Sequence, residues 1–442
     1  MKQTLSGKET FIIGLMLFAL FLGAGNMIFP PLLGQSAGEN VWIAVAGFLI
    51  TGVGLPLLGV VAVGLSGNDV QSLARKVHPL FGVAFPIIMY LAIGPMFGIP
   101  RTGTVAFEIG VTPYLPEEME RNGISLLIYT VVFFSITYAL ALNPAKLVDR
   151  IGKILTPALL AVLALLMFKA FATPMGTFQP TQEPYTEGAF FTGFLEGYLT
   201  MDTIAALVFG IVIVTAIKER GVTSRKAIAG ATVKAGLVAA AGMAAVYLSL
   251  AYLGATSVES IGYSENGAVI LSNSATYLYG SLGTAVLSLA ITFACLTTSV
   301  GLVSACGNYF SKILPSISYR TVILIVTIFG AVIANIGLTQ LIAFSLPILV
   351  AIYPLAIVLI LLSFLDPLFK GSSLVYGFSI LLTGIFSMFD GLTTANINLG
   401  AIETLLEKYL PFFEIGIGWV IPALIGGILG FILSFLRPNH HA

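Results

Sequence analysis

Long apolar runs separated by short polar segments extend over the whole chain. A helix that crosses the hydrocarbon core of a bilayer needs about 20 apolar residues, and counting runs of that length predicts twelve spans. The predicted spans are 9–34, 41–66, 80–111, 123–142, 150–172, 189–217, 227–254, 277–311, 319–336, 340–363, 372–389 and 413–436. The runs are continuous and do not alternate with period two, so we expect helices and not the strands of a membrane barrel.

The composition indicates that lipid is the main solvent. Of the 442 residues, 57% are hydrophobic and 9% are charged, whereas a water-soluble protein carries about 25% charged residues. The sequence therefore predicts an all-α polytopic membrane protein in contact with the lipid bilayer. The charges of the 20 basic and 20 acidic residues cancel, so the protein has no net positive charge to attract nucleic acid. The sequence contains no P-loop motif, so we expect an ion gradient to drive any transport.

Basic residues separate by side across the predicted spans. One set of loops carries most of the Lys and Arg residues, whereas the opposite set carries only Arg121 and Lys408, with Lys169 near an outer end. Because Lys and Arg are retained on the cytoplasmic side, we expect a multi-pass protein with both termini in the cytoplasm. The segment 401–410, in an outer loop, predicts a short interfacial helix.

The first span is interrupted near its middle. The segment Gly23-Ala24-Gly25-Asn26 precedes Pro30 and Pro31. Glycine, asparagine and proline all weaken a helix. A break inside the bilayer is tolerated only where protein or a wet cavity satisfies the freed backbone groups. Freed carbonyls can bind a cation, and freed N–H groups can bind a carboxylate. A packing seam of small residues is the alternative interpretation.

The sixth span begins with an unusual concentration of polar groups. Glu196, the segment Gly197-Tyr198-Leu199-Thr200 and Asp202 follow one another there. Ionisable groups at such a depth in a membrane indicate function by default. The apolar and aromatic segment 189–195 before them favours an intramembrane position, and interfacial carboxylates are the alternative.

Two further spans carry candidate chemistry. In the eighth span, Ala294, Thr297 and Thr298 share one helical face, which brings a carbonyl and two hydroxyl oxygens together. Such oxygens suit a hard cation such as sodium, although threonine also bonds the carbonyls of its own helix. In the third span, Arg101 and Glu108 lie two turns apart on one face. This spacing predicts a structural ion pair, with a gating role as the alternative.

The interruptions in the first and sixth spans are five spans apart, so the two halves are expected to enter the bilayer from opposite sides. Broken helices at matching positions are typical of inverted repeats whose site lies near the midplane. We expect a first repeat at 1–172, an inverted second repeat at 188–364, and two extra helices at 371–442.

Three phrases of the sequence resemble the bacterial branched-chain amino acid carrier family of the BrnQ type. They are GAGNMIFPP at 23–31, GPMFGIPRT at 94–102 and GYLTMD at 197–202. The resemblance extends over essentially the whole chain. It implies the five-plus-five inverted repeat of the leucine transporter (APC-superfamily) fold, with helices one and six broken. It also implies sodium-coupled uptake of leucine, isoleucine and valine across a bacterial cell membrane.

The resemblance further implies roles for individual residues. The substrate-binding residues would be Gly23, Ala24, Gly25, Asn26, Tyr198, Leu199 and Thr200. Sodium, as the coupling ion, would bind at Ala19, Leu22, Ala294, Thr297 and Thr298. Candidates for ion coupling or gating are Asp202, Glu196, Glu108 and Arg101, and the ligand of Asp202 stays open. No other cofactor is expected.

A proton-coupled carrier of the same fold is the main alternative, with Glu108, Glu196 or Asp202 titrating. A channel or a membrane-embedded enzyme fits less well. The sequence has no repeated filter-like segment, and the predicted spans hold neither a histidine nor a nucleophile with a base. We therefore expect a transporter and not an enzyme.

Overall fold

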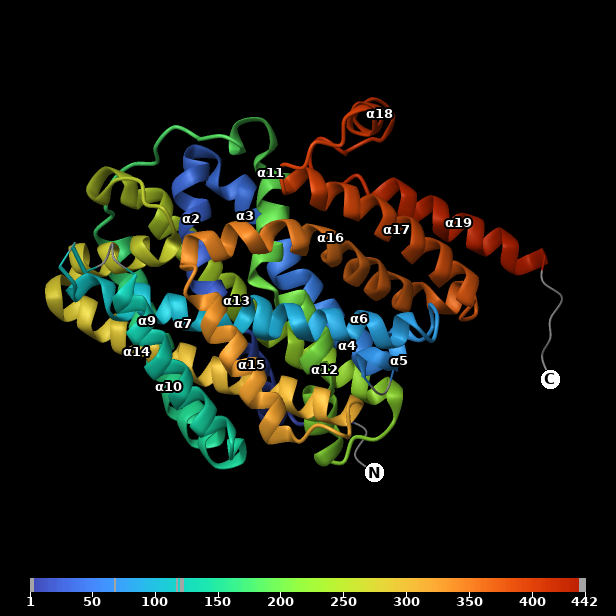
Figure 1. The fold of residues 1–442 in the computed structure, drawn as a ribbon, viewed down its shortest axis with the longest axis horizontal. Coiled ribbons are helices and arrows are strands. Elements are labelled where there is room, and N and C mark those ends of the chain that lie inside the picture. Colours follow the sequence, from blue (N-terminus) through green and yellow to red (C-terminus); the bar gives the residue numbers. More distant parts are fainter. Residues whose placement is uncertain (1–3, 67–68, 117, 120–122, 437–442) are drawn as a thin grey trace.

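A computed structural model describes residues 4–66, 69–116, 118–119 and 123–436, which form helices joined by short connections (Figure 1). The first half of the chain contains α1 (Gly7–Phe21), α2 (Ala24–Ala37), η1 (Gly38–Asn40), α3 (Val41–Leu49), η2 (Ile50–Gly54), α4 (Leu55–Ser66), α5 (Val70–Ala74), α6 (Phe81–Leu91), η3 (Ala92–Met96), α7 (Gly98–Gly110), η4 (Thr112–Tyr114), α9 (Ile124–Ala141) and α10 (Pro144–Ala172). The second half contains α11 (Tyr185–Glu196), η5 (Gly197–Thr200), α12 (Asp202–Glu219), α13 (Arg225–Ile261), α14 (Gly267–Ile313), α15 (Tyr319–Ala334), α16 (Leu338–Leu365), η6 (Asp366–Leu368), α17 (Ser373–Thr394), α18 (Ala401–Tyr409) and α19 (Val420–Leu436).

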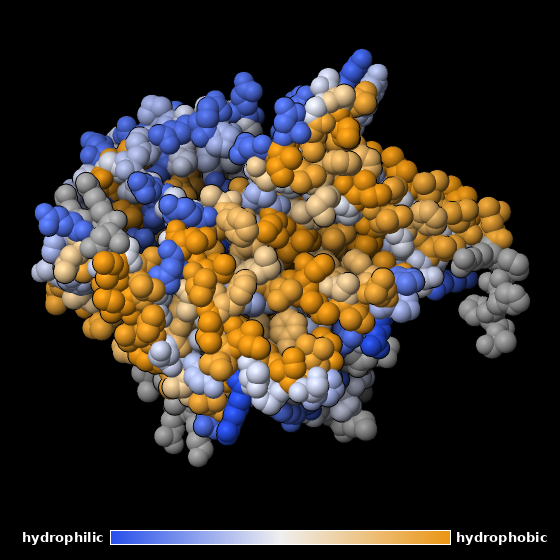
Figure 2. Space-filling view, in the orientation of Figure 1, coloured by the Kyte–Doolittle hydropathy of each residue, from blue (hydrophilic) through white to orange (hydrophobic). Residues whose placement is uncertain are grey.

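Apolar side chains cover the middle of the molecule, and hydrophilic residues gather along its upper and lower edges (Figure 2). By length and composition, seven helices within the described residues could cross a membrane. The number is eight when the bent pair Tyr185–Thr200 and Asp202–Glu219 counts as one span. Shorter apolar helices lie at Pro157–Ala172, Tyr319–Ala334 and Val420–Leu436. The protein is thus an all-helical, multi-span membrane protein, and the number of twelve spans stays a prediction.

Both predicted helix breaks are present. Between α1 and α2, Gly23 is extended, with φ −113° and ψ −173°. Between η5 and α12, Met201 adopts the left-handed conformation with φ 61°, and the two parts of this span are bent by 43°. A side chain at positive φ is rare and persists only where surrounding structure holds it. The surrounding structure therefore holds the second break in place.

The long helix α14 differs from its prediction at two places. It begins ten residues before the predicted position 277, because Asn266 caps its N-terminus. The Asn266 Oδ1 accepts the N–H groups of Ala268 and Val269 at 3.0 and 3.2 Å, as expected of an asparagine N-cap. The helix is also kinked at Gly280, whose φ is 64°, a conformation that glycine adopts without steric cost.

Two other helices begin at positions that differ from the predictions. α10 begins at Pro144 and not at 150, in agreement with the preference of proline for the first helical position. α19 begins at Val420 and not at 413, because the left-handed backbone of Gly416, with a φ of 73°, interrupts the helical conformation just before it. The predicted helix at 401–410 is confirmed as α18, which projects from the upper edge of the molecule in Figure 1.

The helices around the first break approach their neighbours closely through glycine. A Cβ at Gly34 on α2 would lie 2.1 Å from the carbonyl oxygen of Ala251 on α13. A Cβ at Gly254 on α13 would in turn lie 2.0 Å from the carbonyl oxygen of Pro31 on α2. Such backbone contact between small residues is typical of helix pairs in membranes. It fixes α2, and with it the first break, against α13.

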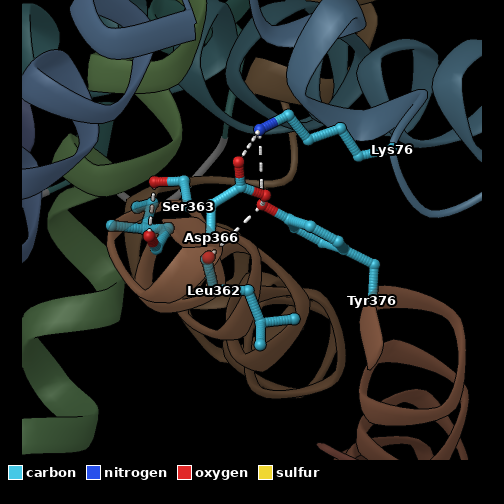
Figure 3. Close-up of polar contacts among 6 residues, drawn as sticks. Lys76, Leu362, Ser363, Asp366 and Tyr376 are labelled. Atoms are coloured by element: carbon cyan, nitrogen blue, oxygen red, sulfur yellow. Dashed lines mark hydrogen bonds and ion pairs between the residues drawn. The ribbon is translucent and has the colours of Figure 1, made fainter. Parts of the chain in front are cut away.

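A polar cluster joins the segment after α5 to the end of α16 and to α17 (Figure 3). The Lys76 Nζ lies 3.1 Å from the Asp366 Oδ2. The Tyr376 hydroxyl donates to the Asp366 Oδ1 at 2.8 Å and lies 3.3 Å from the Leu362 carbonyl oxygen. The cluster therefore links residues that are about 290 positions apart in the chain.

Candidate functional site

A cavity lies between the two helix breaks. It contains about 480 Å³ of empty space, part of which is open to solvent. Backbone from the segment Gly23–Gly25 forms part of its wall. The polar side chains that line it are Asn26, Arg101, Thr102, Thr200, Asp202 and Thr298. The structure thus brings together residues that the sequence separates by more than 270 positions.

The first break has its own hydrogen bond. The Gly23 N–H donates to the Asn26 Oδ1 at 2.8 Å. In an unbroken helix this N–H would bond the carbonyl oxygen of Ala19, four residues earlier. The break therefore leaves the Ala19 carbonyl without its helical donor, next to Leu22, where α1 ends.

Asp202 holds the two breaks together. The Asn26 Nδ2 donates to the Asp202 Oδ2 at 2.7 Å, and the Tyr247 hydroxyl donates to the same oxygen at 2.6 Å. The Asn26 Nδ2 also contacts the Tyr247 hydroxyl. All three side chains are buried. A carboxylate that accepts two such bonds ties α2, α12 and α13 together at the level of the cavity.

The second break contributes backbone groups more than side chains. The Thr200 hydroxyl donates to the Gly197 carbonyl oxygen at 2.9 Å, which closes the turn η5. The carbonyl oxygen of Leu199 accepts a bond from Arg101. Tyr198 does not line the cavity: it is fully buried and stacks on Tyr353, with ring centroids 4.3 Å apart. The predicted substrate role of Tyr198 and Leu199 would therefore be indirect.

Arg101 has other partners than the predicted Glu108. Its Nη1 donates to the Leu199 carbonyl oxygen, and its Nη2 donates to the Ser345 hydroxyl at 3.3 Å. The guanidinium carbon lies 5.0 Å from the centre of the Phe29 ring. The expected ion pair with Glu108 is wrong, because the side chain points toward the exposed carbonyl of the second break and not two turns along its own helix.

Of the predicted sodium ligands on α14, Thr298 lies beside the first break. The Thr297 hydroxyl donates to the Ala294 carbonyl oxygen at 2.8 Å, the local bond that competes with ion binding. The Thr298 Cγ2 lies 3.6 Å from the position that a Cβ would take on Gly23. Thr298 is therefore in contact with the break between α1 and α2, and sodium at this place stays a prediction.

Two of the predicted site residues lie outside the cavity, and two residues that contact the site were not predicted from the sequence. Neither Glu108 nor Glu196 lines it. Tyr247 and Ser345 contact the site, yet each lies in an apolar run where a tyrosine or a serine is common. In the run that contains Ser345, the prolines at 347 and 354 were the local signals of an irregular helix.

Two interrupted helices that line one cavity are the arrangement typical of membrane transporters of the broken-helix type. Solved structures share this fold. An inward-facing structure of Mhp1 is similar with a TM-score of 0.64 at 14% identity, covering 97% of this chain and 91% of that one. MhsT in complex with L-phenylalanine is similar with a TM-score of 0.55 at 18% identity, covering 99% of both chains.

Residues 6–437 match the family described as branched-chain amino acid transport protein, and the chain belongs to this family. Branched-chain amino acid permease BraB of Bacillus subtilis (strain 168) is 55% identical over 99% of this chain and 98% of its own. Permease BrnQ of the same strain is 50% identical over 99% of both chains. BrnQ of Escherichia coli (strain K12) is 41% identical over 98% of this chain and 97% of its own. These relatives are named permeases, which is consistent with a transporter and not with an enzyme.

Proposed function

We propose that this protein takes up leucine, isoleucine and valine together with sodium by alternating access. The permeases and carriers that it resembles over nearly their whole length are named for branched-chain amino acids. That similarity supports the same substrates here. The proposed location is a bacterial cell membrane, with both termini in the cytoplasm.

The observation that carries the proposal is the cavity between the breaks. It offers backbone from Gly23–Gly25 and a carboxylate, Asp202, beside apolar side chains such as Phe21, Ile93 and Phe209. A branched-chain amino acid has a charged end for the polar groups and a hydrocarbon end for the apolar wall. Pockets of this mixed kind, mostly apolar with a few placed polar groups, are typical small-molecule sites.

Sodium is proposed to bind between the first break and α14. Its ligands would be the carbonyl oxygens of Ala19 and Leu22 together with Ala294, Thr297 and Thr298. The freed Ala19 carbonyl and the contact of Thr298 with Gly23 support this position. Because the ion and the amino acid would both favour the conformation in which this interface is closed, each would raise the affinity of the other.

The test is leucine uptake into liposomes that contain the purified protein, with sodium and proton gradients imposed separately. An inward sodium gradient at equal pH should drive accumulation, because sodium is the proposed coupling ion. The double variant Thr297→Ala with Thr298→Ala should raise the sodium concentration for half-maximal uptake by at least about tenfold, equivalent to about 1.4 kcal/mol.

Ser311→Ala is the matched control for this experiment. Its hydroxyl bonds the Asn308 carbonyl oxygen of the same helix at 3.4 Å, and it does not line the cavity. Its sodium dependence should be unchanged. Accumulation driven by a proton gradient without sodium would contradict sodium coupling and support the proton-coupled alternative, with Asp202 as the carboxylate in the cavity. Uptake that does not saturate with leucine would support a channel.

A further inference from the structure

Arg101 is a buried cation at the centre of the fold. Its side chain is 1% exposed, and its Nε has no hydrogen-bond partner within the described part of the chain. The ion pair that the described residues contain, Lys76 with Asp366, lies elsewhere. Burying a charge without an opposite charge costs several kcal/mol, and a charged group at membrane depth indicates function by default.

The groups that contact Arg101 compensate its charge only in part. The Leu199 carbonyl and the Ser345 hydroxyl are neutral acceptors, and the Phe29 ring offers a weak attraction through its face. None of these partners supplies a negative charge. The guanidinium therefore keeps the capacity to bind an anion with a planar, forked set of donors.

The carboxylate of Asp202 lines the same cavity but is already engaged. Its Oδ2 accepts hydrogen bonds from Asn26 and Tyr247, and it forms no ion pair with Arg101 within the described residues. The two opposite charges thus stand apart on the wall of one cavity. A zwitterion would neutralise both at once.

The start of α2 meets the guanidinium at Gly25. A Cβ at this position would lie 3.2 Å from the Arg101 Nη1 and 3.6 Å from the Leu199 carbonyl oxygen. Any side chain here would crowd the guanidinium, so glycine lets the charge lie against the first turn of the helix. The first N–H groups of a helix have no partner within it and carry partial positive charge. A charged side chain and a helix N-terminus therefore converge on one place.

We propose that Arg101 binds the carboxylate of the amino acid substrate, together with the N–H groups at the start of α2. This proposal rests on the proposed function, because it requires an amino acid in the cavity. It makes Arg101 a substrate-binding residue and leaves the ammonium group of the substrate to the Asp202 side of the cavity.

The experiment compares leucine with leucinamide, which keeps the ammonium group and the side chain but has a neutral amide in place of the carboxylate. Binding to the purified full-length protein is measured by competition with radiolabelled leucine and by thermal shift. The unmodified protein should bind leucine at least about 30-fold more tightly than leucinamide, because removing one partner of a buried charge pair has an effect of this size.

Three variants separate binding from a structural role. Arg101→Gln should lose leucine affinity at least about 30-fold while leucinamide affinity changes less than about threefold, so that the preference for leucine disappears. Arg101→Lys, which keeps the charge, should retain part of the preference. Ser311→Ala, whose hydroxyl bonds the Asn308 carbonyl oxygen outside the cavity, should leave the preference unchanged.

Each contrary result is distinguishable. Equal loss of leucine and leucinamide binding in Arg101→Gln would show that Arg101 only supports the second break, which overturns the proposal. If Arg101→Gln does not fold, the unmodified protein still decides, because equal affinity for leucine and leucinamide would also overturn it. An unmodified protein that binds neither compound would overturn the proposed function itself.

Discussion

Two tyrosines in the middle of the molecule are equally buried but differ in what their hydroxyl groups contact. Tyr247 and Tyr198 are both 0% exposed. The Tyr247 hydroxyl donates to the Asp202 Oδ2 at 2.6 Å, whereas the Tyr198 hydroxyl has no partner within the described residues. The same substitution at the two positions therefore isolates the value of the bond to Asp202.

Tyr247→Phe is expected to destabilise the protein by about 1.5–3 kcal/mol, the usual range for a hydrogen bond to a charged group. The ring, and with it the edge-to-face contact with Phe48 at 5.1 Å between centroids, is kept. The loss would therefore reflect the hydroxyl group alone. Chemical unfolding in one detergent, followed by circular dichroism, measures the difference.

Tyr198→Phe is the matched control and should change the free energy of unfolding by less than about 0.5 kcal/mol, as for substitutions that remove no specific contact. A cost in Tyr198→Phe as large as in Tyr247→Phe would contradict this assignment of the two hydroxyl groups. It would mean that burial of the phenol, and not its bond to Asp202, sets the effect.

At the scale of residues, the sequence predicted the polar groups of the site better than their partners. Asn26 and Asp202 stood out because amides and carboxylates are rare inside apolar runs. Tyr247 did not, since aromatic residues are common there. Arg101 stood out as a charge inside a span but was predicted to form a structural ion pair with Glu108, because helical spacing identifies neighbours on one helix and not the carbonyl of another segment.

Helices α2 and α13 depend on glycine at their crossing. A Cβ at Gly254 would lie 2.0 Å from the Pro31 carbonyl oxygen, and this atom belongs to backbone that cannot rotate away. Gly254→Ala is therefore expected to force the helices apart and to destabilise the protein by about 1–3 kcal/mol, the usual cost of overpacking. Thermal unfolding and leucine uptake, measured together, test this expectation.

Gly230→Ala is the matched control on the same helix. No atom lies within 4 Å of the position that its Cβ would take, and alanine is the better helix former by about 1 kcal/mol. This variant should be neutral or slightly more stable. Equal destabilisation by both substitutions would show that α13 is sensitive to any added methyl group and would contradict a specific crossing at Gly254.

At the scale of elements, helix breaks were predictable where several signals coincide. The first break combines two glycines with Asn26, and the second combines a glycine with nearby carboxylates. The kink at Gly280 was not predicted, because glycines inside an apolar run, here Gly280 and Gly283, are usually tolerated in a straight helix. Its φ of 64° is set by packing that the local sequence does not show.

At the scale of the whole molecule, the order of the apolar runs predicted an all-helical membrane protein with matching breaks. The order of the runs did not predict which distant segments contact one another. Lys76 and Asp366, the first after α5 and the second at the end of α16, carry charges in loops that the sequence assigns only to a shared side of the membrane. Which loop charges meet depends on how the helices between them pack.

The ion pair of Lys76 and Asp366 connects the first half of the chain to its last third (Figure 3). Its side chains are 32% and 28% exposed, so water and salt screen the attraction.

A double-mutant cycle with Lys76→Met, Asp366→Asn and the combined variant should give a coupling of about 0.2–1 kcal/mol at low salt. In 1 M salt, where the Debye length is about 3 Å, the coupling should fall by at least about half. The Tyr376 hydroxyl donates to the Asp366 Oδ1 at 2.8 Å and accepts from the Lys76 Nζ at 3.5 Å, so the same cycle in a Tyr376→Phe background isolates the direct pair. A coupling that is absent at low salt, or one that 1 M salt leaves unchanged, would contradict a screened electrostatic link between these two parts of the protein.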